Sequence, residues 1–155
     1  MGKFLSILFA VSLLWIAPAS AQQREVPYWA SLDAEEVNMR VGPSRDFKIE
    51  WVYKREGMPV KVIRVVEGWR RVREPDGTEG WMAASLLRLA PTAMIIGETP
   101  TPMRDSPAQN GGLKWNAEPG VVGRLGVCEA GWCQFDVGGR AGWVEESRLW
   151  GAGEP

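Results

Sequence analysis

One sequence pattern occurs twice in this chain, and this internal repeat constrains the fold more than any other feature. A Gly-Trp pair opens each copy and a second Gly-Trp pair closes it, over residues 68–82 and again over residues 131–144. An apolar residue stands three positions after the first tryptophan in both copies, as Val72 and Phe135. The chain is therefore predicted to be built twice from one unit of about 60 residues.

Further matches extend the repeat over most of the chain. Arg104 stands where Arg40 stands in the first unit, and Trp115 stands where Trp51 stands. We therefore predict two small domains at residues 34–90 and 91–151, with a tether before them at 22–33 and a C-terminal tail after them at 152–155.

The first 21 residues have the features of a signal peptide. Lys3 provides a positive charge, an apolar run of 13 residues follows from Phe4 to Ile16, and Ala19-Ser20-Ala21 fits the small-residue cleavage pattern. An uncleaved membrane anchor is the alternative, but the apolar run is shorter than the ~20 residues that span a bilayer. We expect export, cleavage after Ala21 and no stable membrane insertion afterwards.

Short alternating segments between turn residues predict an all-β fold. Strands are expected at residues 37–41, 51–53, 58–66, 69–73, 79–82 and 87–89, with one helical turn at 83–86. Residues 74–77, Glu-Pro-Asp-Gly, predict a tight turn because proline presets φ and glycine accepts a positive φ. Several short strands without a helical pattern predict a small antiparallel barrel in each unit.

The two cysteines of the sequence flank a predicted hairpin turn in the second unit. If Ala130-Gly131 is a two-residue turn, Glu129 pairs with Trp132 and Cys128 with Cys133. Such a pair is of the closer, non-hydrogen-bonded kind, which suits a disulfide. Export also permits oxidation, so we predict a Cys128–Cys133 disulfide.

Composition excludes several catalytic classes. The chain has no histidine, which removes Ser-His-Asp and Cys-His hydrolases together with the commonest metal ligand. Carboxylate-pair chemistry stays open in principle. We expect a protein that is not an enzyme and that needs neither a cofactor nor a metal.

Charge is distributed unevenly between the units. Residues 37–90 carry 11 basic and 7 acidic side chains, whereas residues 91–155 carry 5 and 8. In an exported protein, a basic face favours an anionic wall polymer, lipid head groups or an acidic partner over nucleic acid. The alternative is a solvated strand edge that resists aggregation. The residues concerned are Lys61, Arg64, Arg70, Arg71 and Arg73.

The combined pattern resembles bacterial SH3-like (SH3b-type) domains in tandem. The matching residues are Asn-Met-Arg-Val-Gly-Pro-Ser at 38–44, Gly68-Trp69 and Gly80-Trp81. The second unit departs from this pattern, because Asp105-Ser106-Pro107 replaces Val-Gly-Pro. The resemblance implies small non-catalytic β-barrels that recognise cell-wall peptides or other peptides, or that serve as adaptors, and it indicates a bacterial periplasm.

The candidate binding residues lie in the first unit. Trp51 and Tyr53 share one face of a predicted strand, with Val52 expected in the core, and Arg71 is expected beside the two aromatic rings as a binding anchor. Such a surface would suit a ligand with carboxylates. For the repeated tryptophans we expect packing, and for Arg40 and Arg104 an ion pair or a loop hydrogen bond; the tryptophans are Trp69, Trp81, Trp132 and Trp143.

Two functions remain after these steps. The first is a non-catalytic periplasmic or secreted binding module of the cell envelope that recognises a cell-wall (peptidoglycan) peptide or another peptide segment. The second is a structural or adaptor protein that docks onto another envelope protein and has no small ligand of its own. Nucleic acid is not an expected partner of either.

Overall fold

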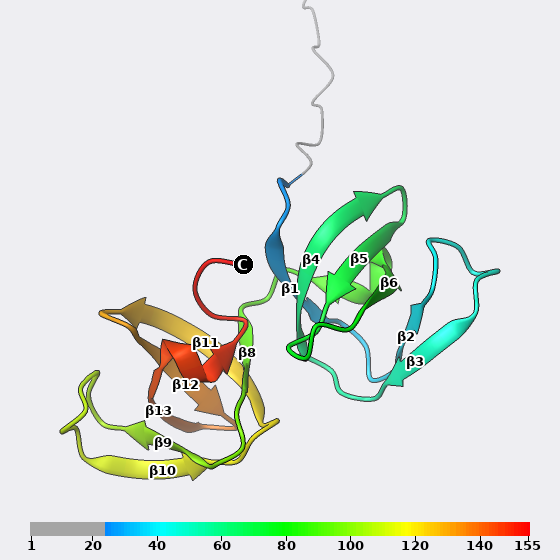
Figure 1. Ribbon diagram of the computed structural model, residues 1–155. Helices are drawn as coiled ribbons and strands as arrows, with labels where there is room; N and C mark the ends of the chain where they lie inside the picture. The colour runs from blue at the N-terminus through cyan, green and yellow to red at the C-terminus, as the bar shows by residue number, and fades with distance from the viewer. Residues whose placement is uncertain (1–23) are drawn as a thin grey trace, which may run out of the picture.

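The computed structural model describes residues 24–155 and is almost entirely β-structure (Figure 1). The predicted signal peptide at 1–21 and its cleavage site lie outside the described residues. Within residues 24–155, no helix has the length and apolar character needed to cross a membrane.

Each half of the chain forms a seven-stranded antiparallel sheet, and the two sheets have the same strand order. The first runs β3-β2-β6-β5-β4-β1-β7 and the second β10-β9-β13-β12-β11-β8-β14. Every strand of the second sheet thus occupies the position of the strand seven earlier. This confirms the predicted fold of two tandem small antiparallel barrels.

The strands of the first barrel are β1 (Tyr28–Leu32), β2 (Val37–Arg40), β3 (Ile49–Tyr53), β4 (Pro59–Val66), β5 (Trp69–Arg73), β6 (Glu79–Ala83) and β7 (Leu87–Arg88). Those of the second are β8 (Thr92–Ile95), β9 (Thr101–Arg104), β10 (Leu113–Ala117), β11 (Val122–Glu129), β12 (Trp132–Val137), β13 (Arg140–Glu145) and β14 (Leu149–Trp150). A single 3₁₀ turn precedes the last strand of each barrel, η1 (Ala84–Leu86) and η2 (Glu146–Arg148).

The prediction of a tether over residues 22–33 is wrong for residues 28–32. These residues form β1, which pairs with β4 and β7 inside the first sheet. The equivalent strand β8 pairs with β11 and β14 in the second. The sequence of β1, Tyr-Trp-Ala-Ser-Leu, does not alternate between apolar and polar residues, so it gives no clear strand signal. In the structure its last three residues are all buried.

Each barrel has its own apolar core, built by the alternation of side chains along its strands. On β2, for example, Val37 and Met39 are fully buried, whereas the intervening Asn38 is only partly so. The two buried clusters are Ala30, Leu32, Val37, Met39, Val60, Val62, Val72 and Met82, and Ala93, Ile95, Met103, Ala117, Cys133, Phe135, Val144, Leu149 and Ala152. Trp81 and Trp132 are buried, and Trp69 and Trp143 are half-buried, which supports the predicted packing role of the repeated tryptophans.

The expectation that Val52 is a core residue is wrong, because its side chain is 46% exposed. Val52 pairs with the half-buried Asn38, whereas Trp51 and Tyr53 pair with the buried residues Met39 and Val37. Paired residues project to the same side of a sheet. Since β3 is the edge strand, Trp51 extends beyond the core and remains 57% exposed.

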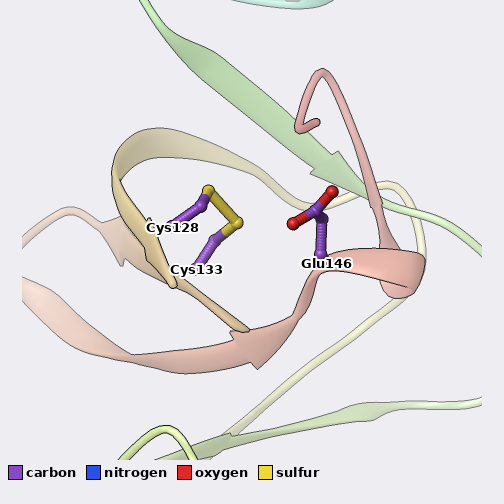
Figure 2. Close-up of side chains that lie close together, drawn as sticks. All are labelled: Cys128, Cys133 and Glu146. Carbon is purple, nitrogen blue, oxygen red and sulfur yellow. A yellow bond between two sulfur atoms is a disulfide. The ribbon is translucent and has the colours of Figure 1, made fainter. Parts of the chain in front are cut away.

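The predicted disulfide is present, and so is the hairpin register from which it was derived (Figure 2). Cys128 pairs with Cys133 and Glu129 with Trp132 across β11 and β12. Glu146 lies close to the two sulfur atoms (Figure 2). Within residues 24–155, these three side chains form the one cluster of potential metal ligands. Because both sulfurs are in the disulfide, neither is available as a thiolate ligand.

Replacing both cysteines with alanine is expected to lower the free energy of unfolding of the second barrel by about 2 kcal/mol. The disulfide closes a short loop, and removing it restores chain entropy to the unfolded state. Urea denaturation of the oxidised wild type and the Cys128→Ala/Cys133→Ala variant would measure the difference. Equal stability of the two proteins would show that the hairpin is held without the bond.

The C-terminal segment of the second barrel contacts the first barrel. The rings of Trp29 and Trp150 pack edge to face with centroids 4.9 Å apart, and the Lys61 ammonium lies over both rings. The Trp29 indole Nε1 donates a hydrogen bond of 2.9 Å to the carbonyl oxygen of Gly153. Residues 152–155 are therefore not a simple tail, since Ala152 also belongs to the second core.

Candidate functional site

A groove of about 330 Å³ lies in the first barrel, between β3 and the turn that joins β5 to β6. Two aromatic side chains and two carboxylates line it, together with a proline and a threonine. The lining residues are Trp51, Tyr53, Glu74, Pro75, Asp76 and Thr78. This is the place where the structure brings predicted site residues together.

The β5–β6 turn fixes the backbone of Glu74 and the side chain of Asp76. The Glu74 amide donates to the Thr78 carbonyl oxygen at 2.9 Å, and the Gly77 amide donates to the Glu74 carbonyl oxygen at 3.0 Å. Gly77 has a φ of +88°, which glycine adopts without strain. The Thr78 amide donates to Asp76 Oδ1 at 2.9 Å, so the Asp76 side chain is held by its own turn.

The two aromatic rings differ in exposure. Tyr53 packs against the first core, and its hydroxyl lies 3.9 Å from Met39 Sδ. Trp51 sits two residues earlier on the edge strand and presents most of its ring to solvent. The groove thus combines one anchored ring and one accessible ring.

The charged side chains that line the groove are acidic. Glu74 is only 5% exposed, and burial, followed by repulsion from Asp76, raises the pKa of its carboxyl group to about 7. The Asp76 pKa is lowered, chiefly by the hydrogen bond from the Thr78 amide. The pKa of Tyr53 is raised, first by burial and then by the nearby carboxylates of Glu74, Asp76 and Glu50. No lysine or arginine is among the lining residues.

Arg71 does not line this groove. Its β5 position pairs with Trp81 on β6, and its guanidinium forms an ion pair with Glu79 at 2.9 Å. Of the three candidate site residues, the structure therefore brings Trp51 and Tyr53 together and places Arg71 elsewhere. The expected arginine beside the aromatic rings is replaced by Glu74 and Asp76, which the sequence marked only as turn residues.

The second barrel lacks the equivalent acidic and aromatic groups. Ala117 occupies the position of Tyr53, and Val137 occupies the position of Glu74. Trp115, the counterpart of Trp51, is also exposed, but the Arg140 guanidinium lies over its ring, 5.4 Å from the centroid. The acidic aromatic groove therefore distinguishes the first barrel from the second.

A larger groove of a different kind, with a volume of about 780 Å³, lies mainly on the second barrel and is also lined by Arg88 of β7 and by residues 90–91. It crosses the sheet from Lys114 on β10, past Trp143 on β13, to Thr92 on β8. Arg104 lies in it and donates to the Gly111 carbonyl oxygen at 2.8 Å. Arg40 makes the corresponding bonds in the first barrel, to the carbonyl oxygens of Arg45 and Phe47, so the repeated arginines have the loop-holding role considered for them.

The fold and the repeated sequence pattern define a family. The bacterial SH3 domain matches the chain twice, over residues 33–88 and 97–151. These two matches cover more than half of the chain. The chain belongs to the bacterial SH3 domain family and carries two tandem copies of the domain.

Comparison with solved structures gives distant similarities. NlpC1 and NlpC2 from Trichomonas vaginalis match with 14% and 12% identity over 89% and 83% of this chain, with TM-scores of 0.38 and 0.37. An NlpC/P60 family protein from Bacillus cereus matches with 10% identity over 79% of this chain, with a TM-score of 0.35. The chain spans about half the length of these structures, at 50%, 49% and 55%. No curated protein matches the sequence.

Proposed function

We propose that this protein is a non-catalytic binding module of the cell envelope, exported to the periplasm or beyond, that recognises a cell-wall peptide or another peptide segment. The observation that carries the proposal is the groove in the first barrel, where the exposed ring of Trp51 stands beside Tyr53. Aromatic side chains of this kind are common anchors for peptide ligands.

Two further points support this proposal. Bacterial SH3 domains are often cell-wall binding modules, and this chain contains two of them. The groove is also small and is bounded by a hydrogen-bonded hairpin turn, which suits a short peptide better than a folded partner. Because a small groove buries little surface, we expect modest affinity.

Replacing either aromatic ring is expected to weaken peptide binding about tenfold or more. Trp51→Ala removes the accessible ring, and Tyr53→Ala removes the anchored ring, each of which contributes apolar contact to a ligand. Isothermal titration of soluble peptidoglycan fragments against the wild type and both variants would measure the affinities.

Two variants serve as controls for this titration. Trp115→Ala removes the equivalent exposed ring of the second barrel, and Arg71→Ala removes a side chain outside the groove. Both should bind as the wild type does. If Trp51→Ala binds equally well while Trp115→Ala does not, the second barrel is the binding site. If the wild type binds no wall fragment at all, the adaptor function becomes the better proposal.

A further inference from the structure

Glu74 has a buried carboxylate oxygen that residues 24–155 leave without a hydrogen-bond partner. Its side chain is 5% exposed, yet its Oε1 atom has no hydrogen-bond partner among residues 24–155. Buried carboxylates in native proteins are ordinarily paired with a cation or with hydrogen-bond donors, since an unpaired one is costly. Glu74 lines the groove, and a ligand that reaches its carboxylate there would supply the missing partner.

The neighbouring cations are already engaged elsewhere. On β5, the guanidinium groups of Arg71 and Arg73 both bind the Glu79 carboxylate, at 2.9 and 2.6 Å. Just after β3, the Lys54 ammonium lies 3.6 Å from the Glu36 carboxylate. The described residues therefore contain no ion pair to Glu74, and the groove keeps an uncompensated negative charge whenever Glu74 is ionised.

The remaining groups of the groove favour the same kind of ligand. Asp76 adds a second, exposed carboxylate, and the ring of Trp51 offers an accessible aromatic face. A cation is attracted both to a carboxylate and to the face of an indole ring. A ligand carboxylate in the same place would meet two like charges and no arginine.

We propose that Glu74 and the ring of Trp51 together bind an alkylammonium group, so that the groove selects peptides with a free amino group. This inference rests on the proposed function, because it names the chemical group by which the same groove recognises its peptide. The inference places this binding site in the first barrel alone. In the second barrel, Val137 stands in place of Glu74 and Ala117 in place of Tyr53.

The proposal is tested with wall stem peptides in two forms, one with free amino groups and one with the same groups acetylated. The wild type should bind the free form roughly 10 to 100 times more tightly, the range expected for a hydrogen bond to a charged group. Glu74→Gln keeps the shape of the side chain but not its charge, so it should bind both forms with the weaker affinity. Glu67→Gln removes an exposed carboxylate on the β4–β5 turn and should behave as the wild type does.

The pH dependence provides a second readout that a purely structural role of Glu74 would not produce. The side-chain ammonium of a lysine-containing stem peptide stays charged between pH 6 and 8, whereas Glu74, with its pKa of about 7, ionises over this range. Affinity for the free amine should therefore rise from pH 6 to pH 8 in the wild type and stay constant in Glu74→Gln. Among the other titratable groups near Glu74, Asp76 raises the Glu74 pKa, and Glu50 acts on Tyr53. The pKa of Asp76 is lowered and the pKa of Tyr53 is raised, so both move away from the range of pH 6 to 8.

Each outcome separates this inference from the proposed function. If the wild type binds both peptide forms equally and Trp51→Ala binds neither, the groove binds peptides but does not recognise the amine. If the wild type binds neither form, n-butylammonium is titrated while the Trp51 indole resonance is followed by NMR. A shift in the wild type that is lost in Glu74→Gln supports the cation site alone, and no shift in the wild type overturns it.

Discussion

Phe135→Ala is expected to lower the free energy of unfolding of the second barrel by about 3–5 kcal/mol, the usual cost of removing a buried phenyl ring. Phe135 is fully buried, is the largest fully buried side chain among residues 24–155 and lies on β12 between β11 and β13. Its neighbours include Gly123 and Gly142, which have no side chains that could fill the space. The cavity would therefore stay largely open.

Hydrogen exchange measures this effect separately in each barrel, because amides in the two sheets report their own opening free energies. Protection should fall in β11, β12 and β13 and change little in β4, β5 and β6. Val127→Ala, at an exposed position on β11, is the matched control and should alter stability by less than about 0.5 kcal/mol. A loss below about 1 kcal/mol in Phe135→Ala would contradict the central place of this ring in the core.

At pH 8, Glu74→Gln is expected to be more stable than the wild type by about 3 kcal/mol. The folded protein raises the Glu74 pKa from 4.5 to about 7, so folding favours the protonated carboxyl group. The stability contributed by this group is fully present below pH 4.5 and is lost as the pH rises through about 7. A shift of this size corresponds to about 3 kcal/mol at 1.36 kcal/mol for each pH unit.

Urea denaturation of the wild type and the variant between pH 4 and pH 8 would test this prediction. Near pH 4 both side chains are neutral, so the two proteins should have similar stability, and the difference should grow toward pH 8. Glu67→Gln, the same substitution at an exposed position, is the control and should show no such growth. A wild type that is more stable than Glu74→Gln at pH 8 would mean that Glu74 has a cationic partner in the folded protein.

A stabilising Glu74→Gln substitution also bears on function. Residues that cost stability but remain in a groove are commonly found where a ligand binds, because ligand sites need groups left unpaired in the free protein. If the variant is more stable and binds amine-bearing peptides less well, unfolding cannot explain the loss of binding. The two measurements together therefore test one physical statement about the Glu74 carboxylate.

Local sequence patterns determined much of the fold. The repeated Gly-Trp pairs predicted two equivalent domains, and the Glu-Pro-Asp-Gly turn at residues 74–77 predicted the β5–β6 hairpin. The two-residue turn at Ala130-Gly131 predicted the register that pairs Cys128 with Cys133. These features are local: turn residues fix backbone angles, and strand alternation fixes which side chains share a face.

Long-range packing decided what local patterns left open or indicated incorrectly. Residues 28–32 form a strand because β4 and β7 flank them, and Val52 is exposed because the pairing of β3 with β2 turns Trp51 and Tyr53, not Val52, toward the side of the core. The site depends on packing in the same way. Glu74 lies more than 20 residues from Trp51 and Tyr53 in the sequence, and only the closure of the first barrel places it beside the two rings, in a groove whose lining residues include no arginine. The burial of Glu74, and the lack of an ion pair to it among residues 24–155, arise from the whole barrel, and for that reason the chemistry of the groove became visible only in the tertiary structure.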